Sequence, residues 1–341
     1  MICSNYAVCT YSALTQERIR VGIAAEYFRQ STTRLLKEKL NVLPQLLLNK
    51  NQIFNYGFPV EMGDQVYIQP NEYQRDREMF YADNDSTRVC TRCQSTFHVN
   101  TDGSQAITSS AAICQDIDGV QYNFHIHTQQ PMKNLKLFKK APEVNEFNGE
   151  MSGKLFAIDV ESVYTSKGQE VGRVTMVDYL GTTLIDAIVK PENQIFDYVT
   201  KYSGLTPNHM QFATETLDSV REKIFDHINE ESILVGHALN GDLKSLRILH
   251  SKVIDTSVLF ESNGRRPSLQ KLSSFHLKRE IQNSAGGHCS KEDAVASLQL
   301  VYFGLMNPPS SVSILSSFLF NALISCPLFN STLYILFCIC F

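Results

Sequence analysis

The order of short apolar runs between residues 154 and 306 constrains the fold most strongly. Three runs rich in β-branched residues lie close together, with Gly168 and Gly181 in the turn-prone segments between them. Two more runs follow at wider spacing, separated by helical patterns. Closely spaced runs are typical of an antiparallel meander, and strands joined through a helix are typically parallel. The predicted fold is α/β, a mixed five-stranded sheet flanked by helices, with strands at 154–160, 173–179, 183–189, 232–237 and 251–256.

The composition divides the chain into unlike parts. With 341 residues it is long enough for about two domains. We expect a helical or irregular N-terminal region with an amphipathic helix near 24–40, a turn-rich module, a linker with two prolines and four lysines, the α/β domain, and an apolar tail. Their predicted bounds are 1–85, 86–127, 128–153, 154–306 and 307–341.

The tail is the least typical part, since no charged residue occurs from Ala294 to Phe341. Residues 311–341 are apolar enough to consider a membrane anchor, because about 20 apolar residues span a bilayer. Pro327 and Asn330 interrupt the run, and no Lys or Arg flanks it. Residues 338–341 also fit a prenylation box without the usual basic neighbours. We favour an alternative or non-native C-terminal end over both.

The charge of the chain excludes a general attraction to nucleic acid. The formal net charge is −4, so such contacts must come from a local basic patch or from bound cations. Four lysines at 133–140 are compatible with an electrostatic track for RNA, although a solvated linker is the commoner meaning of such a run.

The most informative acidic pair is Asp159 and Glu161, at the end of the first predicted strand. Residues i and i+2 of a strand project to the same face, so both carboxylates leave the sheet side by side. Taken alone, Asp242 is better explained as a helix N-cap and Asp293 as an acid in the first turn of a helix. His288, after two glycines, could be an ordinary loop residue.

Together these five residues indicate a chemistry. Two-metal hydrolysis of a phosphodiester needs several hard oxygen ligands around cations about 3.5–4 Å apart. A histidine, whose side chain ordinarily titrates near pH ~6.5, is suited to accept the proton of the attacking water at neutral pH. Four carboxylates also balance the charge of two divalent cations.

Four segments in this order resemble the Rex family of RNA exonucleases, in the DEDDh branch of the RNase D/T-like superfamily: FAIDVESVYTSKGQEVGRVTMVD, KPENQIFDYVTKYSGLT, ILVGHALNGDLKSLRILHSKVIDT and GGHCSKEDAVASLQL. The resemblance implies an RNase H-like fold and a nuclear location. It also implies release of nucleoside 5′-monophosphates from a 3′ end. Two Mg²⁺ or Mn²⁺ ions would be bound by Asp159, Glu161, Asp242 and Asp293, with His288 as the general base.

The resemblance also suggests substrate contacts. The family usually has Asp-Cys-Glu-Met where this chain has Val160 and Ser162 in the second and fourth positions, and Ser162 would pack less well on the terminal nucleotide. Leu205 would contact the terminal base. His237 either contacts the substrate phosphate or has a structural role, which we favour slightly. Asp255 is expected to be a capping acid rather than a metal ligand.

A second candidate metal site precedes the α/β domain. Cys90 and Cys93 form a CxxC pair, followed by Cys114 and then His125 or His127, with roughly the spacing of a structural zinc site. The family often carries a similar cluster there. The sequence is compatible both with a bound Zn²⁺ and with a metal-free module, and either histidine could be the fourth ligand. The nine cysteines lack regular disulfide spacing, so we expect a reducing compartment.

The predicted function is metal-dependent trimming of RNA 3′ ends, with nucleic acid as the expected partner and protein partners unknown. Two alternatives remain open. One is a DNA or mixed-substrate exonuclease, because the acidic set does not sense the 2′-hydroxyl. The other is a non-catalytic interaction or membrane-tethered isoform, which the tail motivates.

Overall fold

The computed structural model describes residues 26, 29–39, 41–70, 80–82, 84–106, 113–283 and 287–307. The chain divides into two compact units, Met1–Leu46 with Tyr302–Phe341, and Leu47–Val301. In the first unit residues 29–39 are helical, as expected for the segment near 24–40. All predicted site residues belong to the second unit. The finer five-part division stays a prediction.

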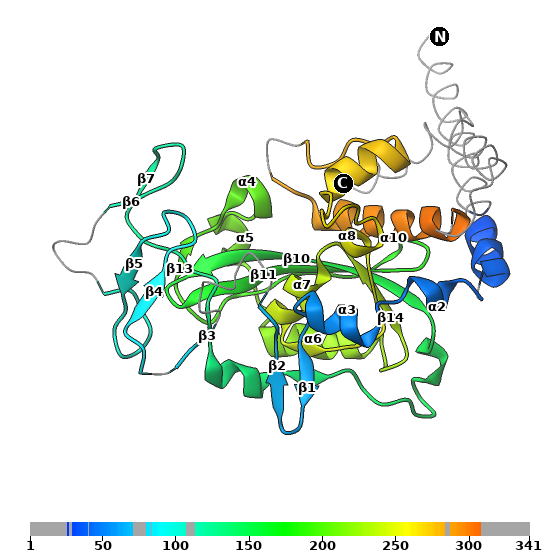
Figure 1. The fold of residues 1–341 in the computed structure, drawn as a ribbon, viewed down its shortest axis with the longest axis horizontal. Coiled ribbons are helices and arrows are strands. Elements are labelled where there is room, and N and C mark those ends of the chain that lie inside the picture. The colour runs from blue at the N-terminus through cyan, green and yellow to red at the C-terminus, as the bar shows by residue number, and fades with distance from the viewer. Residues whose placement is uncertain are drawn as a thin grey trace, which may run out of the picture. The chain divides into compact units, whose positions relative to one another are not determined.

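The centre of the second unit is a mixed sheet ordered β12-β11-β10-β14-β16. The pairs β12–β11 and β11–β10 are antiparallel, and β10–β14 and β14–β16 are parallel. The predicted mixed α/β arrangement is therefore confirmed (Figure 1). The bounds are β10 (Leu155–Thr165), β11 (Gly168–Asp178), β12 (Thr183–Ile188), β14 (Ile233–Gly236) and β16 (Val253–Asp255).

The sheet differs from the prediction in one strand. β13 (Ile195–Asp197) pairs antiparallel with the far end of β10 and makes the sheet six-stranded. Three residues are too few for a period-2 pattern to be recognised, and β13 forms because β10 extends beyond its predicted end. β10 and β11 are each 11 residues long because they pair along their length as one hairpin.

The main helices bury apolar faces against this sheet. In α6 (Leu217–Phe225), Val220 and Ile224 are fully buried, four residues apart as one helix face requires. α7 (Leu239–Leu246) contributes leucines to the same core. In Figure 1, α3 (Lys50–Asn55), α6 and α7 lie together below the long β10 and β11 strands. The last described helix is α10 (Ser290–Met306).

The other helices are short. They are α2 (Leu43–Leu46), α4 (Thr200–Ser203), α5 (Pro207–Gln211), α8 (Thr256–Leu259), α9 (Leu269–Leu272), the 3₁₀ helices η2 (Met132–Leu137) and η3 (Gly149–Met151), and the π-helix η4 (Ser273–Leu277). Within the described ranges no helix is long and apolar enough to cross a membrane. The segment 311–341, considered as an anchor, lies outside those ranges.

Paired short strands make up the rest of the second unit. They are β1 (Val60–Met62) with β2 (Gln65–Tyr67), β3 (Phe80–Tyr81) with β8 (Gln130–Pro131), β4 (Thr87–Val89) with β5 (Thr96–His98), β6 (Cys114–Gln115) with β7 (Gln121–Tyr122), and β9 (Lys139–Lys140) with β15 (Ile248–Leu249). Residues of the predicted linker thus lie against the sheet domain. Leu137 O also accepts a hydrogen bond from Arg221 Nη1 at 3.0 Å.

Candidate active site and cysteine cluster

β10 positions the first two acids. Asp159 lies opposite Thr175 and Glu161 opposite Arg173 in the β10–β11 register. The register then shifts between Glu161 and Ser162, and this bulge lies directly beside the acidic pair. Such irregularities are common next to active sites, where they redirect side chains.

The four predicted carboxylates come together. Burial, and then the charges of Asp242, Glu161 and Asp293, raise the pKa of Asp159 well above its ordinary value. Burial, followed by Asp293, raises the pKa of Glu161 to about 7. Burial and Glu292 raise the pKa of Asp293 to about 6, against a lowering hydrogen bond from Gln282. Carboxylates that hinder each other's ionisation are close in space, and a cation would remove that cost.

Asp242 is presented by α7, and its explanation as an N-cap is wrong. The N-cap is Ala238, and the capping carboxylate is that of Asp255. Oδ1 of Asp255 accepts from Ala238 N at 3.0 Å, and Oδ2 accepts from Leu239 N at 2.9 Å. Oδ1 also caps α8 through Ser257 N at 2.9 Å. Asp255 is thus confirmed as a capping acid, and it fixes the turn from which Asp242 projects.

His288 reaches the acids from the segment before α10. Its Nδ1 lies 3.8 Å from Asp293 Oδ2, and ligand atoms of Glu161, His288 and Asp293 all lie within 4.8 Å of one another. Burial lowers the pKa of His288, so the imidazole is neutral at neutral pH.

Gly287 allows this approach. Its φ is +98°, and a Cβ there would overlap the carbonyl oxygen of Thr200 and lie 2.5 Å from Gly204 Cα. His288 N donates to Tyr202 O at 3.0 Å in the same contact. Only glycine permits this close packing, because any larger residue would push the segment of α4 and Gly204 away from His288.

Two contacts that the sequence patterns missed hold the start of α10. Gln282 Nε2 donates to Asp293 Oδ2 at 2.7 Å, while Asp293 Oδ1 is buried without a hydrogen-bond partner. The Thr175 and Ser290 hydroxyls are hydrogen-bonded at 2.6 Å and join β11 to the first residue of α10. The acid beginning a helix was recognisable, but its polar neighbours come from distant segments.

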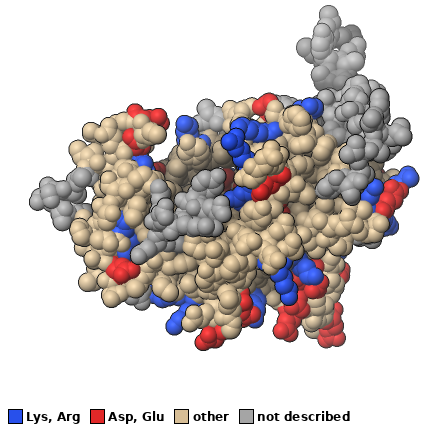
Figure 2. Space-filling model, viewed as in Figure 1, with Lys and Arg blue, Asp and Glu red and all other residues tan. Residues whose placement is uncertain are grey.

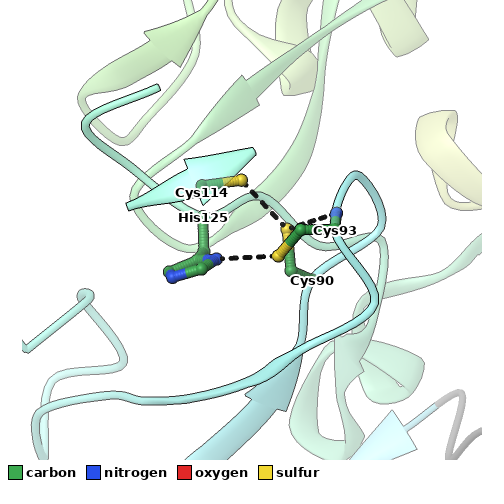
Figure 3. A group of neighbouring side chains, drawn as sticks. All are labelled: Cys90, Cys93, Cys114 and His125. Atoms are coloured by element: carbon green, nitrogen blue, oxygen red, sulfur yellow. Dashed lines mark hydrogen bonds between the residues drawn. The ribbon is translucent and has the colours of Figure 1, made fainter. Parts of the chain in front are cut away.

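The cysteine cluster forms beside this domain, as Figure 3 shows. Ligand atoms of Cys90, Cys93, Cys114 and His125 all lie within 4.8 Å of one another. The Cys90 and Cys114 sulfurs are 3.7 Å apart, and Cys93 Sγ is 3.3 Å from His125 Nδ1. A tetrahedral zinc with ~2.3 Å bonds to sulfur has sulfur–sulfur edges of about 3.8 Å. These side chains have the spacing of a zinc site.

The two candidate histidines are distinguished by their positions. Both rings lie near Phe97, at 5.0 Å for His125 and 5.9 Å for His127, but only His125 is a member of the cluster, and the His127 ring lies 6.3 Å from that of Tyr81. Burial lowers the pKa of His127 to about 4. His127 is thus an apolar-packed core residue, and His125 is the fourth member of the cluster.

Arg92 connects the cluster to the sheet. Its Nη1 donates to Cys114 Sγ at 3.5 Å, and its Nη2 forms an ion pair with Asp197 of β13. The Phe124 and Phe196 rings stack 4.2 Å apart across the same junction. The cluster and the sheet domain therefore pack as neighbours within one unit.

The chain is similar to known exonucleases. No family model matches the chain. A Caenorhabditis elegans protein named RNA exonuclease pqe-1 is 32% identical, over 80% of this chain and 19% of its own length. Human RNA exonuclease 1 homolog is 38% identical, over 51% of this chain and 15% of its own length. The chain is a homologue of Rex-type exonucleases.

The chain spans about a fifth or less of the length of these two relatives. The nematode match covers more than the part after residue 153, so it extends into the region that contains the cysteine cluster or the N-terminal segments. Among solved structures, the Saccharomyces cerevisiae Pan2 pseudoubiquitin hydrolase–RNA exonuclease module in complex with A7 RNA is similar. It is 27% identical over 54% of this chain and 32% of that chain, with a TM-score of 0.44.

The substrate contacts expected from the Rex-type pattern stay predictions. Val160 and Ser162 are partly buried on β10 beside the acids. Leu205 is only 1% exposed, and its side chain fills the space that a Cβ on Gly172 would need. His237 Nδ1 is 2.9 Å from Thr256 Oγ1, and burial lowers its pKa. Leu205 and His237 thus have structural partners.

Proposed function

We propose that this chain is a 3′→5′ exoribonuclease that uses two divalent cations, Mg²⁺ or Mn²⁺, and releases nucleoside 5′-monophosphates. One observation carries the proposal. Asp159, Glu161, Asp242 and Asp293, from one strand and two helices, converge at one place, with His288 beside Asp293. Hard oxygen ligands in this number suit Mg²⁺ or Mn²⁺ rather than a softer metal.

The residues fit bound cations. Asp293 Oδ1 is buried with no hydrogen-bond partner, so an acceptor is available that the protein itself does not satisfy. The pKa values of all four carboxyls are raised, which means that their ionised forms lack compensating positive charge. Two divalent cations, when bound, activate a water and stabilise the departing 3′ oxygen.

The protein groups supply proton transfer and positioning. The neutral imidazole of His288 has a ring nitrogen free to accept the proton of the attacking water. Gly287 and Tyr202 fix its backbone, and Gln282 orients Asp293. The Arg173 guanidinium makes two 2.8 Å hydrogen bonds to Asp186, which hold this positive group opposite Glu161.

RNA is the proposed substrate because the relatives are named RNA exonucleases. The acids themselves do not distinguish RNA from DNA, so DNA or mixed-substrate activity is the alternative. The nuclear location that the family resemblance implies is part of the same proposal.

The test uses the full chain with 5′-labelled single-stranded RNA and DNA of equal sequence. We expect stepwise shortening of the RNA in Mg²⁺ or Mn²⁺, with nucleoside 5′-monophosphates as products and no shortening in EDTA or with Asp159→Ala. Asp64→Ala, which changes an exposed acid in the β1–β2 turn, is the matched control and should remain active. If the RNA and the DNA are shortened equally, the mixed-substrate alternative is established. The absence of turnover with both Mg²⁺ and Mn²⁺ would refute the proposed exonuclease activity.

We also propose that Cys90, Cys93, Cys114 and His125 bind one structural Zn²⁺. Burial raises the pKa of the Cys114 thiol to about 12, so several thiolates together need a cation. Purified chain should contain about one equivalent of zinc by elemental analysis. Cys93→Ser should lose it and Cys289→Ser, outside the cluster, should retain it. A zinc-free wild type that folds normally would disprove the site.

A further inference from the structure

An open groove lies on the surface of α9 and η4, and the proposed catalytic residues do not line it. It encloses about 750 Å³. Residues at its surface include Phe260, Lys271, Phe275, His276, Lys278 and Glu280. All belong to the unit that contains the sheet.

Aromatic rings run along this groove. The His276 ring lies 4.8 Å from Phe260 and 4.8 Å from Phe275, so three rings are in sequence. Phe275 is 70% exposed, which is unusual for a phenylalanine on a short helical turn packed against the protein. A flat apolar ring open to solvent is a surface on which a nucleic-acid base can stack.

The charge of the groove is positive. Lys278 Nζ lies 5.2 Å from the centre of the Phe275 ring, and Lys271 lines the same surface. Among the described lining residues Glu280 is the only acid, and it accepts a 2.8 Å hydrogen bond from Ser274. Figure 2 shows Lys and Arg side chains in the upper part of the view, where Figure 1 draws the gold-coloured segment around residue 270. Aromatic rings and lysines that lie side by side suit a single-stranded nucleic acid, because its bases can stack on the rings and its phosphates can contact the lysines.

The groove is joined to the acids through a short stretch of chain. Leu269 and Leu272 of α9 pack with Ile281 and with Ala296 and Leu300 of α10. The chain then continues from Lys278 to Gln282, which holds Asp293 of α10. The helix that forms one side of the groove, α9, therefore packs directly against α10, the helix that carries Asp293.

We propose that this groove binds the single-stranded RNA that lies 5′ of the terminal nucleotides held at the catalytic site. Its bases stack on Phe275 and His276, and its phosphates contact Lys271 and Lys278. The inference rests on the proposed function for the path of the RNA. Stacking and backbone contacts do not select sequence, so the groove favours RNA length rather than a particular sequence.

The test measures binding rather than turnover. Full-length chain carrying Asp159→Ala is titrated into fluorescein-labelled RNA of 12 and of 3 nucleotides, and anisotropy gives Kd. Phe275→Ala should weaken 12-mer binding about fivefold or more, with little change for the 3-mer. Lys271→Ala with Lys278→Ala should lower the slope of log Kd against log salt by about 1.4, for two lost phosphate contacts.

Matched controls remove equal groups elsewhere. Phe147→Ala changes a ring that is 85% exposed, and Lys50→Ala with Lys154→Ala removes two exposed lysines. These controls should bind both RNAs as the parent does. Unchanged 12-mer affinity and an unchanged salt slope in the groove variants would overturn the proposal. Weaker RNA binding by the groove variants, together with no exonuclease activity in the wild-type chain, would support the groove and refute the proposed function.

Discussion

Gln282 donates a 2.7 Å hydrogen bond to Oδ2 of Asp293, the acid whose other oxygen is buried without a partner. Gln282 has φ +60°, and its backbone N–H is bonded to Glu292 Oε2 at 3.2 Å. Gln282 thus has an uncommon backbone conformation, and both its backbone N–H and its side chain are hydrogen-bonded to α10. These contacts indicate a residue that positions Asp293.

We expect Gln282→Leu to lower kcat about 10–100-fold and to raise the Mg²⁺ concentration needed for half-maximal rate, because Asp293 loses its orienting donor. RNA KM should change little. Gln211→Leu, which alters an exposed glutamine at the end of α5, should behave as wild type. If Gln282→Leu has the kcat and the Mg²⁺ requirement of the wild type, the hydrogen bond to Asp293 has only a structural role.

Gly287 should be intolerant of a side chain. Gly287→Ala places a Cβ against the Thr200 carbonyl and 2.5 Å from Gly204 Cα, so His288 must move. A displacement of about 1 Å costs on the order of 100-fold in rate. Gly63→Ala is the control, because Gly63 has a similar positive φ with nothing within 4 Å. Assays should show the loss only for Gly287→Ala, and equal activities would contradict the role given to this contact.

The clustered carboxyls should make stability depend on pH in a defined direction. Their pKa values are raised in the folded chain, from 4.5 to about 7 for Glu161 and from 3.8 to about 6 for Asp293. A raised folded pKa contributes stability that is present below the unfolded pKa and is lost as pH rises through the folded value. In EDTA, Tm should therefore fall between about pH 4 and pH 7.

Mg²⁺ should raise Tm more at pH 8 than at pH 5, because the ligands must be ionised to bind it. Thermal unfolding with and without Mg²⁺ measures this difference. Glu161→Gln should reduce the fall of Tm with pH in EDTA. A Mg²⁺ effect equal at both pH values would argue against metal binding by these acids.

Asp255 should matter for stability more than any exposed acid. Its fully buried carboxylate accepts three backbone hydrogen bonds at two helix starts. Asp255→Ala should lower the free energy of unfolding by about 1–4 kcal/mol in urea titrations, since each of the two lost caps contributes about 0.5–2 kcal/mol. Asp226→Ala, an exposed site at the end of α6, should change it little. A loss below about 0.5 kcal/mol would contradict the capping role.

The patterns that predicted this fold are local. Alternation and helical spacing indicated the strands and α6, and Asp159 and Glu161 followed from the period-2 geometry of one strand. β13 was missed because its pairing depends on the length of β10. The choice of His125 over His127 was not available from spacing, since either reaches a CxxC pair along the chain. It depends on tertiary packing.

Gln282 illustrates the same limit in the candidate site. A glutamine in a loop carries no periodic signal, and its partner Asp293 is 11 residues away along the chain. The groove is similar, because Phe275 looks like an ordinary helix residue in the sequence, yet its ring is exposed on the π-helix η4. Contacts between segments decide these features.

The most direct measurement of the central claim is the fate of 5′-labelled RNA with full-length chain in Mg²⁺, compared with EDTA and with Asp159→Ala. We predict a ladder that shortens from the 3′ end, yields nucleoside 5′-monophosphates, and is absent in both comparisons. A ladder that persists in EDTA or in Asp159→Ala, or internal cleavage instead of stepwise shortening, would contradict this mechanism.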